Sequence, residues 1–345
     1  MDTIYIKINT EKDLSCQLTT GADIIKSGGL VVFPTETVYG LGASALSSDA
    51  AEKIYAAKGR PSDNPLIIHI SKPEDAEKYA IVPPVYYELA KRFLPGPLTV
   101  IMPKRDIIPY TVTGGLDTVA VRCPENAVAR ELIRLSGVPI AAPSANISGK
   151  PSPTSADHVK VDMDGRVNMI IDGGECTIGL ESTIIKLDEN TATLLRPGAI
   201  TPEMIAEVIP NIKLDNGITK RIETNIAPLA PGMKYKHYAP RAQVYLVSGE
   251  FDKVEKYISD AISNDPNVGV LCFEEMTKNI KGKYVVNFGK ANDAAAHAHM
   301  LFSALRYFDT TLVNKIYATS VNASGVDLAT YNRMLKASGY TIIEL

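Results

Sequence analysis

Apolar, strand-like runs in the first two thirds of the chain repeatedly end in a basic, hydroxyl or amide residue. Six segments have this form: VVFPTETVYGLG (31–42), AAKGRPSDNPLIIHI (56–70), VAVRCP (119–124), PIAAPSANISGKPSPT (139–154), GLESTIIKL (179–187) and LLRPGAI (194–200). Because buried charges and unpaired buried hydroxyls are costly, we interpret the six interruptions as parts of one polar pocket. Its cations are Lys58, Arg60, Arg122 and Arg196, without a comparable set of carboxylates. The pocket is therefore expected to bind an anion, most simply phosphate.

Strand-like and helix-like runs alternate through residues 1–210, which predicts an α/β domain with a mixed, twisted sheet. We expect strands at 31–33, 65–70, 98–102, 118–122, 138–142, 169–171, 183–187 and 193–196. We expect helices at 54–58, 85–93, 126–135 and 202–208. Asp49 and Glu52 have capping-box spacing before the first of these helices, and Gly59 ends it.

Residues 212–241 interrupt this alternation. They include LDNGITKRIETNIAPLAPGMKYKHYAPR, which carries three prolines and little apolar periodicity. So long a stretch without regular structure is usually functional or disordered. The aromatic cluster of Tyr235, His237 and Tyr238 is too specific for a simple spacer. We therefore predict a catalytic domain at 1–211 and a functional linker at 212–241.

Residues 242–345 again alternate between strands and helices. Strands are expected at 243–247, 268–273, 284–288 and 315–318, and helices at 251–263, 293–308 and 327–337. This pattern predicts a smaller, Rossmann-like domain with a mostly parallel sheet. It contains neither GxGxxG nor GxxxxGK[ST], the two common nucleotide-binding patterns.

Composition excludes several classes of protein. No apolar run approaches the roughly 18 residues that span a membrane, and the polar N-terminus has no signal-peptide core. These features predict a cytoplasmic protein with no membrane contact. The four cysteines form no CxxC pair and the five histidines lack metal-binding spacing, so we do not expect a zinc site. The net charge of −3 argues against tight binding to nucleic acid.

The sequence K-G-R places Lys58 and Arg60 on either side of a predicted helix end. Cations at a helix C-terminus are also favoured by the helix dipole, so a purely structural role is an alternative. Ser62 and Asn64 add hydroxyl and amide donors at alternate positions of the following loop. Fixed cations together with neutral donors are what triphosphate recognition requires.

Three further positions have both a functional and a structural interpretation. Ser144 and Asn146 follow a strand directly, where α/β sheets bind ligands, but their loop also has turn composition. Arg122 ends a strand and suits a carboxylate, although a surface salt bridge would explain it equally well. His69 lies on an apolar strand, where a histidine is more often part of the core. No serine lies in a nucleophile elbow, so the chemistry is expected to depend on positioning and charge neutralisation, as in nucleotidyl transfer.

The motifs PTETVYGLG (34–42), KGRPSDNPL (58–66), SANISGKPSPT (144–154), GLESTI (179–184) and LLRPG (194–198) together resemble the YrdC/TsaC family. With GMKYKHYAP (232–240) and a C-terminal α/β domain, the chain is similar to the long, two-domain threonylcarbamoyl-AMP synthases of that family. The resemblance covers essentially the whole chain.

This resemblance implies a reaction in which L-threonine, bicarbonate and ATP give threonylcarbamoyl-AMP and pyrophosphate. The product would serve N6-threonylcarbamoyladenosine formation in tRNA, through a separate transferase complex, with weak or no direct tRNA binding by this chain. Mg²⁺ is implied by the triphosphate, with no identified protein ligands and no organic cofactor. The linker would act as a lid over the nucleotide, since the intermediates hydrolyse readily.

The resemblance also assigns roles to residues of this chain. Lys58 and Arg60 are implied to be catalytic. ATP is implied to contact Lys58, Ser62, Thr118, Ser144, Asn146, Ser152, Arg196 and Tyr238. L-threonine is implied to contact Thr35, His69, Arg122, the backbone of Ala142, and Ser182, with Arg122 on the carboxylate.

Two other functions stay open on the sequence. A carbamoyl transferase of the hydrogenase-maturation type would need zinc-finger modules, and the chain has no paired CxxC motifs. A non-catalytic RNA-binding YrdC-like module would need a basic surface, which the acidic balance disfavours.

Overall fold

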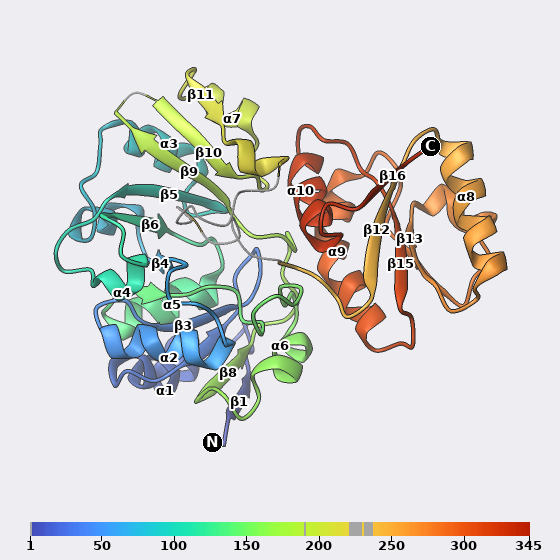
Figure 1. The fold of residues 1–345 in the computed structure, drawn as a ribbon. Helices are drawn as coiled ribbons and strands as arrows, with labels where there is room; N and C mark the ends of the chain where they lie inside the picture. The colour runs from blue at the N-terminus through green and yellow to red at the C-terminus, as the bar shows by residue number, and fades with distance from the viewer. Residues whose placement is uncertain (1, 190, 221–229, 231–236) are drawn as a thin grey trace. The chain divides into compact units, whose positions relative to one another are not determined.

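The computed structural model describes residues 2–189, 191–220, 230 and 237–345, which form two compact units (Figure 1). The first unit comprises Met1–Ser148, Ser152–Thr177 and Glu181–Lys234. The second comprises Gly149–Pro151, Ile178–Leu180 and Tyr235–Leu345. Two short loops from the N-terminal part of the chain thus belong to the second unit.

The first unit is built on an eleven-stranded mixed sheet, as predicted. The strands are, in spatial order, β1 (Ile4–Lys7), β8 (Met169–Asp172), β2 (Val31–Phe33), β3 (Gly40–Ser44), β7 (Ile140–Ala141), β4 (Ile67–His69), β6 (Thr118–Arg122), β5 (Leu98–Pro103), β9 (Thr183–Asp188), β10 (Thr191–Arg196) and β11 (Ile212–Leu214). Strands β4 and β6 run parallel, with His69 opposite Arg122, while β5 is antiparallel to β6. Polar residues from distant parts of the sequence therefore meet at neighbouring strand ends.

The helices of the first unit follow capping signals in the sequence. They are α1 (Leu14–Lys26), α2 (Ser48–Lys58), α3 (Val85–Phe93), α4 (Tyr110–Thr113), α5 (Ala127–Ser136), α6 (Ala156–Met163), α7 (Pro202–Ala206) and the 3-10 helices η1 (Pro73–Lys78) and η2 (Asn216–Ile218). The capping box predicted at Asp49 and Glu52 is wrong: the cap of α2 is Ser47, whose side chain accepts from the Ala50 amide at 3.2 Å. The predicted end at Gly59 is confirmed, with φ of 62°.

Sequence patterns missed α1 and β3. In α1, the buried Leu18, Ala22 and Ile25 recur at helical spacing behind the Asp13 cap, a signal that was present in the sequence. In β3 the sequence is GLGAS, and its glycines have low strand propensity. Packing between β2 and β7 on either side overrides that preference.

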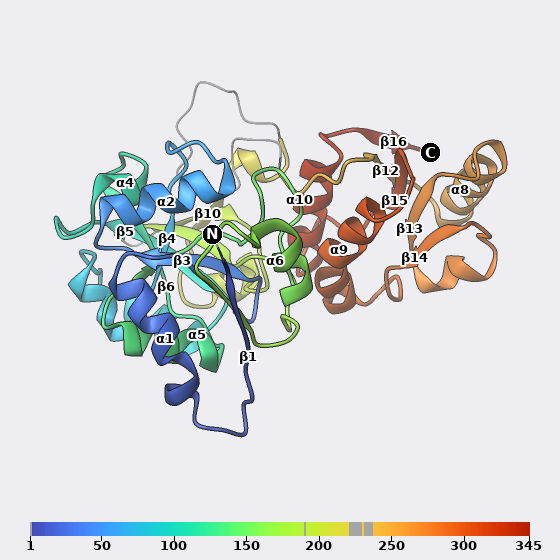
Figure 2. The same ribbon diagram turned by 90° about the horizontal axis from the view of Figure 1, so that it is seen from below.

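A buried apolar cluster joins α1 and α5 to one face of the sheet, where the two helices lie side by side (Figure 2). Its buried members include Leu18, Ile25, Val31, Val128, Leu132, Ile140 and Ile171. The cluster supports the strands whose ends carry the predicted site, because Val31 and Ile140 come from β2 and β7.

Strand β11 and helix η2 occupy the start of the segment predicted to be a linker. Strand β11 runs parallel to β10, and the Asp215 side chain caps η2. The prediction of irregular structure therefore does not hold for residues 212–218. The predicted lid residues 221–229 and 231–236 lie outside the described part of the chain.

The second unit contains a five-stranded parallel sheet, which confirms the predicted architecture. Its strands are, in spatial order, β14 (Tyr284–Asn287), β13 (Gly269–Cys272), β15 (Lys315–Thr319), β12 (Gln243–Ser248) and the unpredicted β16 (Ile342–Glu344). Its helices are α8 (Phe251–Asn264), α9 (Ala294–Asp309), α10 (Asp327–Ala337) and the 3-10 helix η3 (Glu274–Lys278). Helices α9 and α10 cover one face of this sheet and α8 the other (Figures 1 and 2).

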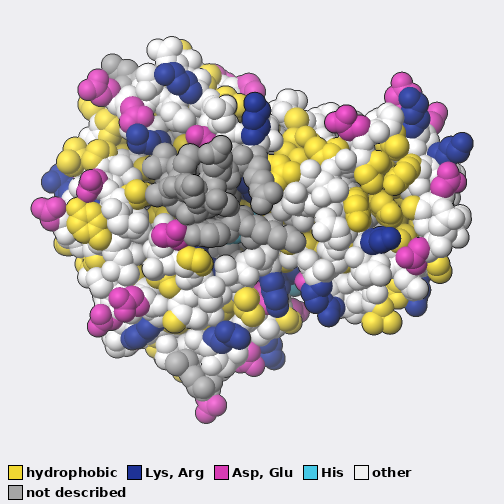
Figure 3. Space-filling view, in the orientation of Figure 1, with side chains coloured by type: hydrophobic (Ala, Val, Ile, Leu, Met, Phe, Trp, Pro, Cys, Tyr) yellow, Lys and Arg dark blue, Asp and Glu magenta, His cyan; other side chains and the backbone are white. Residues whose placement is uncertain are grey.

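Charges of both signs are interspersed on the surface drawn in Figure 3, where Lys and Arg side chains form no continuous stripe. Among the described residues, no helix combines the length and apolarity needed to cross a bilayer.

We predict that Leu132→Ala lowers the free energy of unfolding by about 2–5 kcal/mol, because Leu132 is 0% exposed in the α1–α5 cluster and its truncation leaves a cavity. Chemical denaturation measures the change. The matched control is Val161→Ala at a side chain 78% exposed, which should change stability by less than about 0.5 kcal/mol. Equal effects of the two substitutions would contradict the assignment of this core.

Candidate active site

Lys58 joins two of the predicted motifs into one cluster. It is the last residue of α2, only 2% exposed, and its Nζ donates to the Ser144 and Asn146 carbonyl oxygens, each at 2.6 Å. Ser144 Oγ in turn donates to Asn146 Oδ1 at 2.5 Å. The two segments are 86 residues apart in sequence, so the fold creates this cluster. These contacts are compatible with both interpretations of Lys58, a structural cation that fixes the loop and a group that binds phosphate.

Arg60 organises the loop that follows. Its Nη2 donates to the carbonyl oxygens of Asn64 at 3.1 Å and Pro65 at 3.0 Å. Ser62 is exposed at the loop surface, as a ligand contact requires. The Asn64 side chain is instead fully buried, so the two predicted donors do not share one surface.

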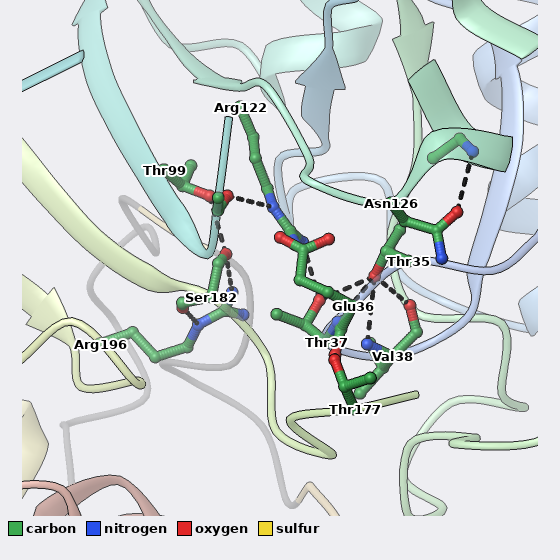
Figure 4. Close-up of polar contacts among 12 residues, drawn as sticks. Thr35, Glu36, Thr37, Val38, Thr99, Arg122, Asn126, Thr177, Ser182 and Arg196 are labelled. Carbon is green, nitrogen blue, oxygen red and sulfur yellow. Dashed lines mark hydrogen bonds and ion pairs between the residues drawn. The ribbon is translucent and has the colours of Figure 1, made fainter. Parts of the chain in front are cut away.

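Arg122 lies in a buried ion pair at the end of β6. Its Nη2 donates to Glu36 Oε1 at 2.7 Å and its Nη1 to Thr37 Oγ1 at 2.8 Å (Figure 4). Arg122 and Glu36 are 4% and 5% exposed, so the alternative of a surface salt bridge is wrong. Sequence reasoning missed Glu36, although a carboxylate beside Thr35 in an otherwise apolar segment was a usable signal.

The charge of Arg122 favours the ionised form of Glu36. Burial disfavours the Glu36 carboxylate, but the Arg122 guanidinium and its hydrogen bond hold the pKa of Glu36 below its usual value. The Glu36 carboxyl is therefore ionised at neutral pH. In this geometry the carboxylate that Arg122 holds is that of Glu36, and its predicted contact with a substrate carboxylate stays a prediction.

Thr35 belongs to the same network. Its Oγ1 lies 2.9 Å from Thr37 Oγ1 and donates to the Val38 carbonyl at 2.6 Å. It also accepts from the amides of Thr37 and Val38. Arg122 Nη1 also donates to Thr37 Oγ1. Thr37 therefore connects Thr35 to Arg122 in one buried hydrogen-bond network.

His69 is buried beside Arg122 on the neighbouring strand. It is 4% exposed, its Nδ1 lies 3.3 Å from the Ile140 carbonyl oxygen, and its ring meets the edge of Phe33. Burial, with a smaller contribution from the Arg122 charge, lowers the pKa of His69 to about 3. The ring is thus neutral at physiological pH. The Ile140 contact assigns the ring hydrogen to Nδ1 and leaves Nε2 as an acceptor.

Ala142 follows β7 directly and is 2% exposed. Its amide donates to the Ile67 carbonyl at 2.9 Å and so extends the sheet. The predicted backbone contact of Ala142 with a ligand would therefore use its carbonyl oxygen.

Ser182 and Arg196 form a second buried group next to β5. Ser182 Oγ lies 2.7 Å from Thr99 Oγ1, and Arg196 Nη2 donates to Ser182 Oγ at 3.1 Å (Figure 4). Thr99 stands opposite Arg122 in the β5–β6 pairing. The structure thus brings Ser182 and Arg196 to the same region of the sheet as Arg122.

The remaining predicted residues are Ser152, Thr118 and Tyr238. Ser152 Oγ donates to the buried Glu181 Oε1 at 2.5 Å. Thr118 begins β6, about 13 Å along the strand from Arg122. Tyr238 belongs to the second unit, where its ring packs against Phe302 at 5.2 Å, and its contact with the nucleotide stays a prediction.

No group of three or more His, Cys, Asp or Glu side chains is placed for a metal ion within the described ranges.

The first unit has the architecture of a YrdC-type domain. It combines a twisted mixed sheet, Lys58 hydrogen-bonded to the Ser144–Asn146 loop, and Arg122 at a strand end. A family model described as "Telomere recombination", for Sua5, YciO and YrdC proteins, matches residues 23–198. A second, described as "Threonylcarbamoyl-AMP synthase, C-terminal domain", matches residues 200–339. The chain belongs to the Sua5/YciO/YrdC family, in its two-domain form.

Relatives of this chain match it over nearly its whole length. The threonylcarbamoyl-AMP synthase of Pyrococcus abyssi is 48% identical over 99% of this chain and 100% of that protein. The enzyme of the same name from Bacillus subtilis is 46% identical over 95% of this chain and 94% of that protein. A crystal structure of P. abyssi Sua5 complexed with L-threonine superposes with a TM-score of 0.92 at 47% identity, covering 100% of both chains.

We predict that His69 makes the folded protein sensitive to acid. An unfolded histidine has a pKa of about 6.5, so as the pH falls from about 6.5 to about 3 the unfolded state binds a proton that the folded state does not. The contribution of His69 to stability is complete above pH 6.5 and is lost toward pH 3, by about 1.4 kcal/mol per pH unit.

Chemical denaturation between pH 7 and pH 5 tests this prediction. The free energy of unfolding should fall more steeply with acid in the wild-type protein than in His69→Gln, which has no titrating ring. Equal slopes for the two proteins would show that His69 is not held neutral by the fold.

Proposed function

We propose that this chain is an L-threonylcarbamoyladenylate synthase, which converts L-threonine, bicarbonate and ATP into threonylcarbamoyl-AMP and pyrophosphate. The observation that carries the proposal is the pair of buried cations in the first unit: Lys58 at the end of α2, hydrogen-bonded to the Ser144–Asn146 loop, and Arg122 at the end of β6. The near full-length similarity to synthases of that name supports it.

Arg122 is the group for the threonine carboxylate. A guanidinium has five N–H donors, and the contacts to Glu36, Thr37 and the Gly96 carbonyl use three of them. One N–H on each Nη then remains for two carboxylate oxygens, which is the bidentate arrangement that arginine favours. The neutral His69 offers Nε2 as an acceptor for the substrate hydroxyl or amine, close to Thr35, Ser182 and the Ala142 carbonyl.

In this proposal the nucleotide binds to the cluster formed by Lys58, Arg60 and the Ser144–Asn146 loop. Lys58 and Arg60 would neutralise the phosphates, with Ser62, Ser144 and Asn146 as neutral donors. Arg196, Ser152, Thr118 and Tyr238 are the further proposed ATP contacts. Mg²⁺ bound to the triphosphate would supply further charge neutralisation, with phosphate and water as its expected ligands.

The chemistry then needs positioning rather than a covalent intermediate. The threonine amine attacks bicarbonate, and loss of water gives a carbamate. A carbamate oxygen attacks the α-phosphorus in line, and the bond to pyrophosphate breaks. Lys58 and Arg60 stabilise the negative charge that develops on the leaving group. Closure of the linker protects the carbamate and the mixed anhydride from water.

The product passes to a separate transferase complex that modifies tRNA, and the whole sequence of steps is cytoplasmic. This chain itself binds tRNA weakly or not at all, because a net charge of −3 gives it little attraction for a polyanion.

Pyrophosphate release tests the function directly. ATP and Mg²⁺ are supplied with L-threonine and bicarbonate added singly and together. Release that requires both additions establishes the synthase reaction. Absence of release, with salt-dependent tRNA binding instead, would replace it with the RNA-binding alternative.

We predict that Lys58→Met and Arg60→Met each reduce turnover by about 10²–10³, the usual loss when a preorganised charge is removed. The matched control is Lys53→Met on the same helix, since Lys53 Nζ is exposed and donates to the Gly28 carbonyl. This control should retain near wild-type turnover.

Threonine binding by calorimetry checks that each variant is folded, because Arg122 and His69 are untouched. Near wild-type pyrophosphate release by Lys58→Met would contradict its role at the phosphates.

A further inference from the structure

Helix α9 contacts loops from the N-terminal part of the chain through the Arg306 side chain and through the backbone of Ala298 and His299. His299, Phe302 and Arg306 are separated by three and four residues, so they lie on the same side of the helix. Phe302 is 0% exposed and Arg306 is 8% exposed, although arginine is usually found at the surface.

Arg306 holds the first of these loops. Its Nη2 donates to the Pro151 carbonyl oxygen at 2.6 Å, and the Ala239 amide donates to the Gly149 carbonyl at 3.0 Å. Gly149–Pro151 is thus fixed from two directions inside the second unit. A hydrogen bond from a charged donor is shorter and stronger than one between neutral groups.

The second loop lies directly against the backbone of α9. A Cβ atom on Gly179 would come within 2.6 Å of the His299 Cα and 2.8 Å of the Ala298 carbonyl oxygen. Gly179 also has φ of 84°, which a side chain would strain. The contact therefore requires glycine and leaves no space between Ile178–Leu180 and the helix.

The first loop leads into the proposed site after one peptide bond and the second after two. Pro151 is followed by Ser152, and Leu180 by Glu181 and Ser182. Ser152 and Glu181 are both buried, and Ser152 Oγ donates a hydrogen bond to Glu181 Oε1 at 2.5 Å. The residues that directly follow the two loops are thus hydrogen-bonded to each other, and Glu181 precedes Ser182 in the chain.

We propose that α9 positions the nucleotide site and that Arg306 is a positioning residue for ATP binding, acting through Pro151 on Ser152; this rests on the proposed function. Without the Arg306 bond, the Pro151 carbonyl loses its charged donor and the Gly149–Pro151 loop moves. Ser152 moves with it, while the Gly179 contact continues to hold Ser182 on the threonine side. Binding of ATP then weakens and binding of threonine does not.

Calorimetry on the full chain tests this split. Arg306→Met removes the donor, Arg306→Gln shortens it, and Arg306→Lys keeps a cation that still reaches a carbonyl. We expect the affinity for a non-hydrolysable ATP analogue and the KM for ATP to worsen about tenfold in the Met and Gln variants, since small misplacements of binding groups are costly. The affinity for L-threonine should stay within about twofold, and the Lys variant should recover most of the ATP affinity.

Lys253→Met, at an exposed side chain of α8 in the same unit, is the control and should bind both ligands as the wild type does. Unchanged ATP affinity in folded Arg306→Met or Arg306→Gln would overturn the proposal. Equal losses of ATP and threonine affinity without rescue by lysine would also overturn it, because they would indicate a structural role. Wild-type protein that binds ATP but releases no pyrophosphate would refute the proposed function alone, since the affinities test Arg306 without turnover.

Discussion

The buried ion pair between Arg122 and Glu36 organises the centre of the first unit. A guanidinium that is 4% exposed needs acceptors on all sides, and no single segment can provide them. Glu36 and Thr37 supply two from the loop after β2, and the Gly96 carbonyl supplies a third before β5. The pair therefore fixes three chain segments at once, and the neutrality of His69 follows partly from the same charge.

Lys58 is also a buried cation whose hydrogen-bond acceptors come from a distant part of the sequence. Its buried ammonium is satisfied by backbone carbonyls of the Ser144–Asn146 loop, which therefore has to stay close to the end of α2. Cations buried in this way are already oriented before any ligand binds, so little reorganisation would accompany binding. The cost is structural: each cation depends on acceptors far away in sequence.

The sequence predicted the architecture of both units and most strand ends that carry polar groups, because strand periodicity and helix caps are local signals. The carboxylate of Glu36 beside Thr35 was a local signal, but its partner Arg122 is 86 residues away, so the sequence could not show that the two form a pair. Asn64 was expected beside Ser62, but packing buries its side chain. Residues 212–218 look irregular in isolation and become regular only by pairing with β10, a tertiary effect.

The loops Gly149–Pro151 and Ile178–Leu180 belong to the second unit although the surrounding chain belongs to the first. The boundary in space therefore differs from any single cut in the sequence. A chimera of two relatives that exchanges only the residues after 211 would combine α9 of one protein with the two loops of the other. An exchange that keeps the contacts of α9 must transfer Gly149–Pro151, Ile178–Leu180 and the C-terminal segment together.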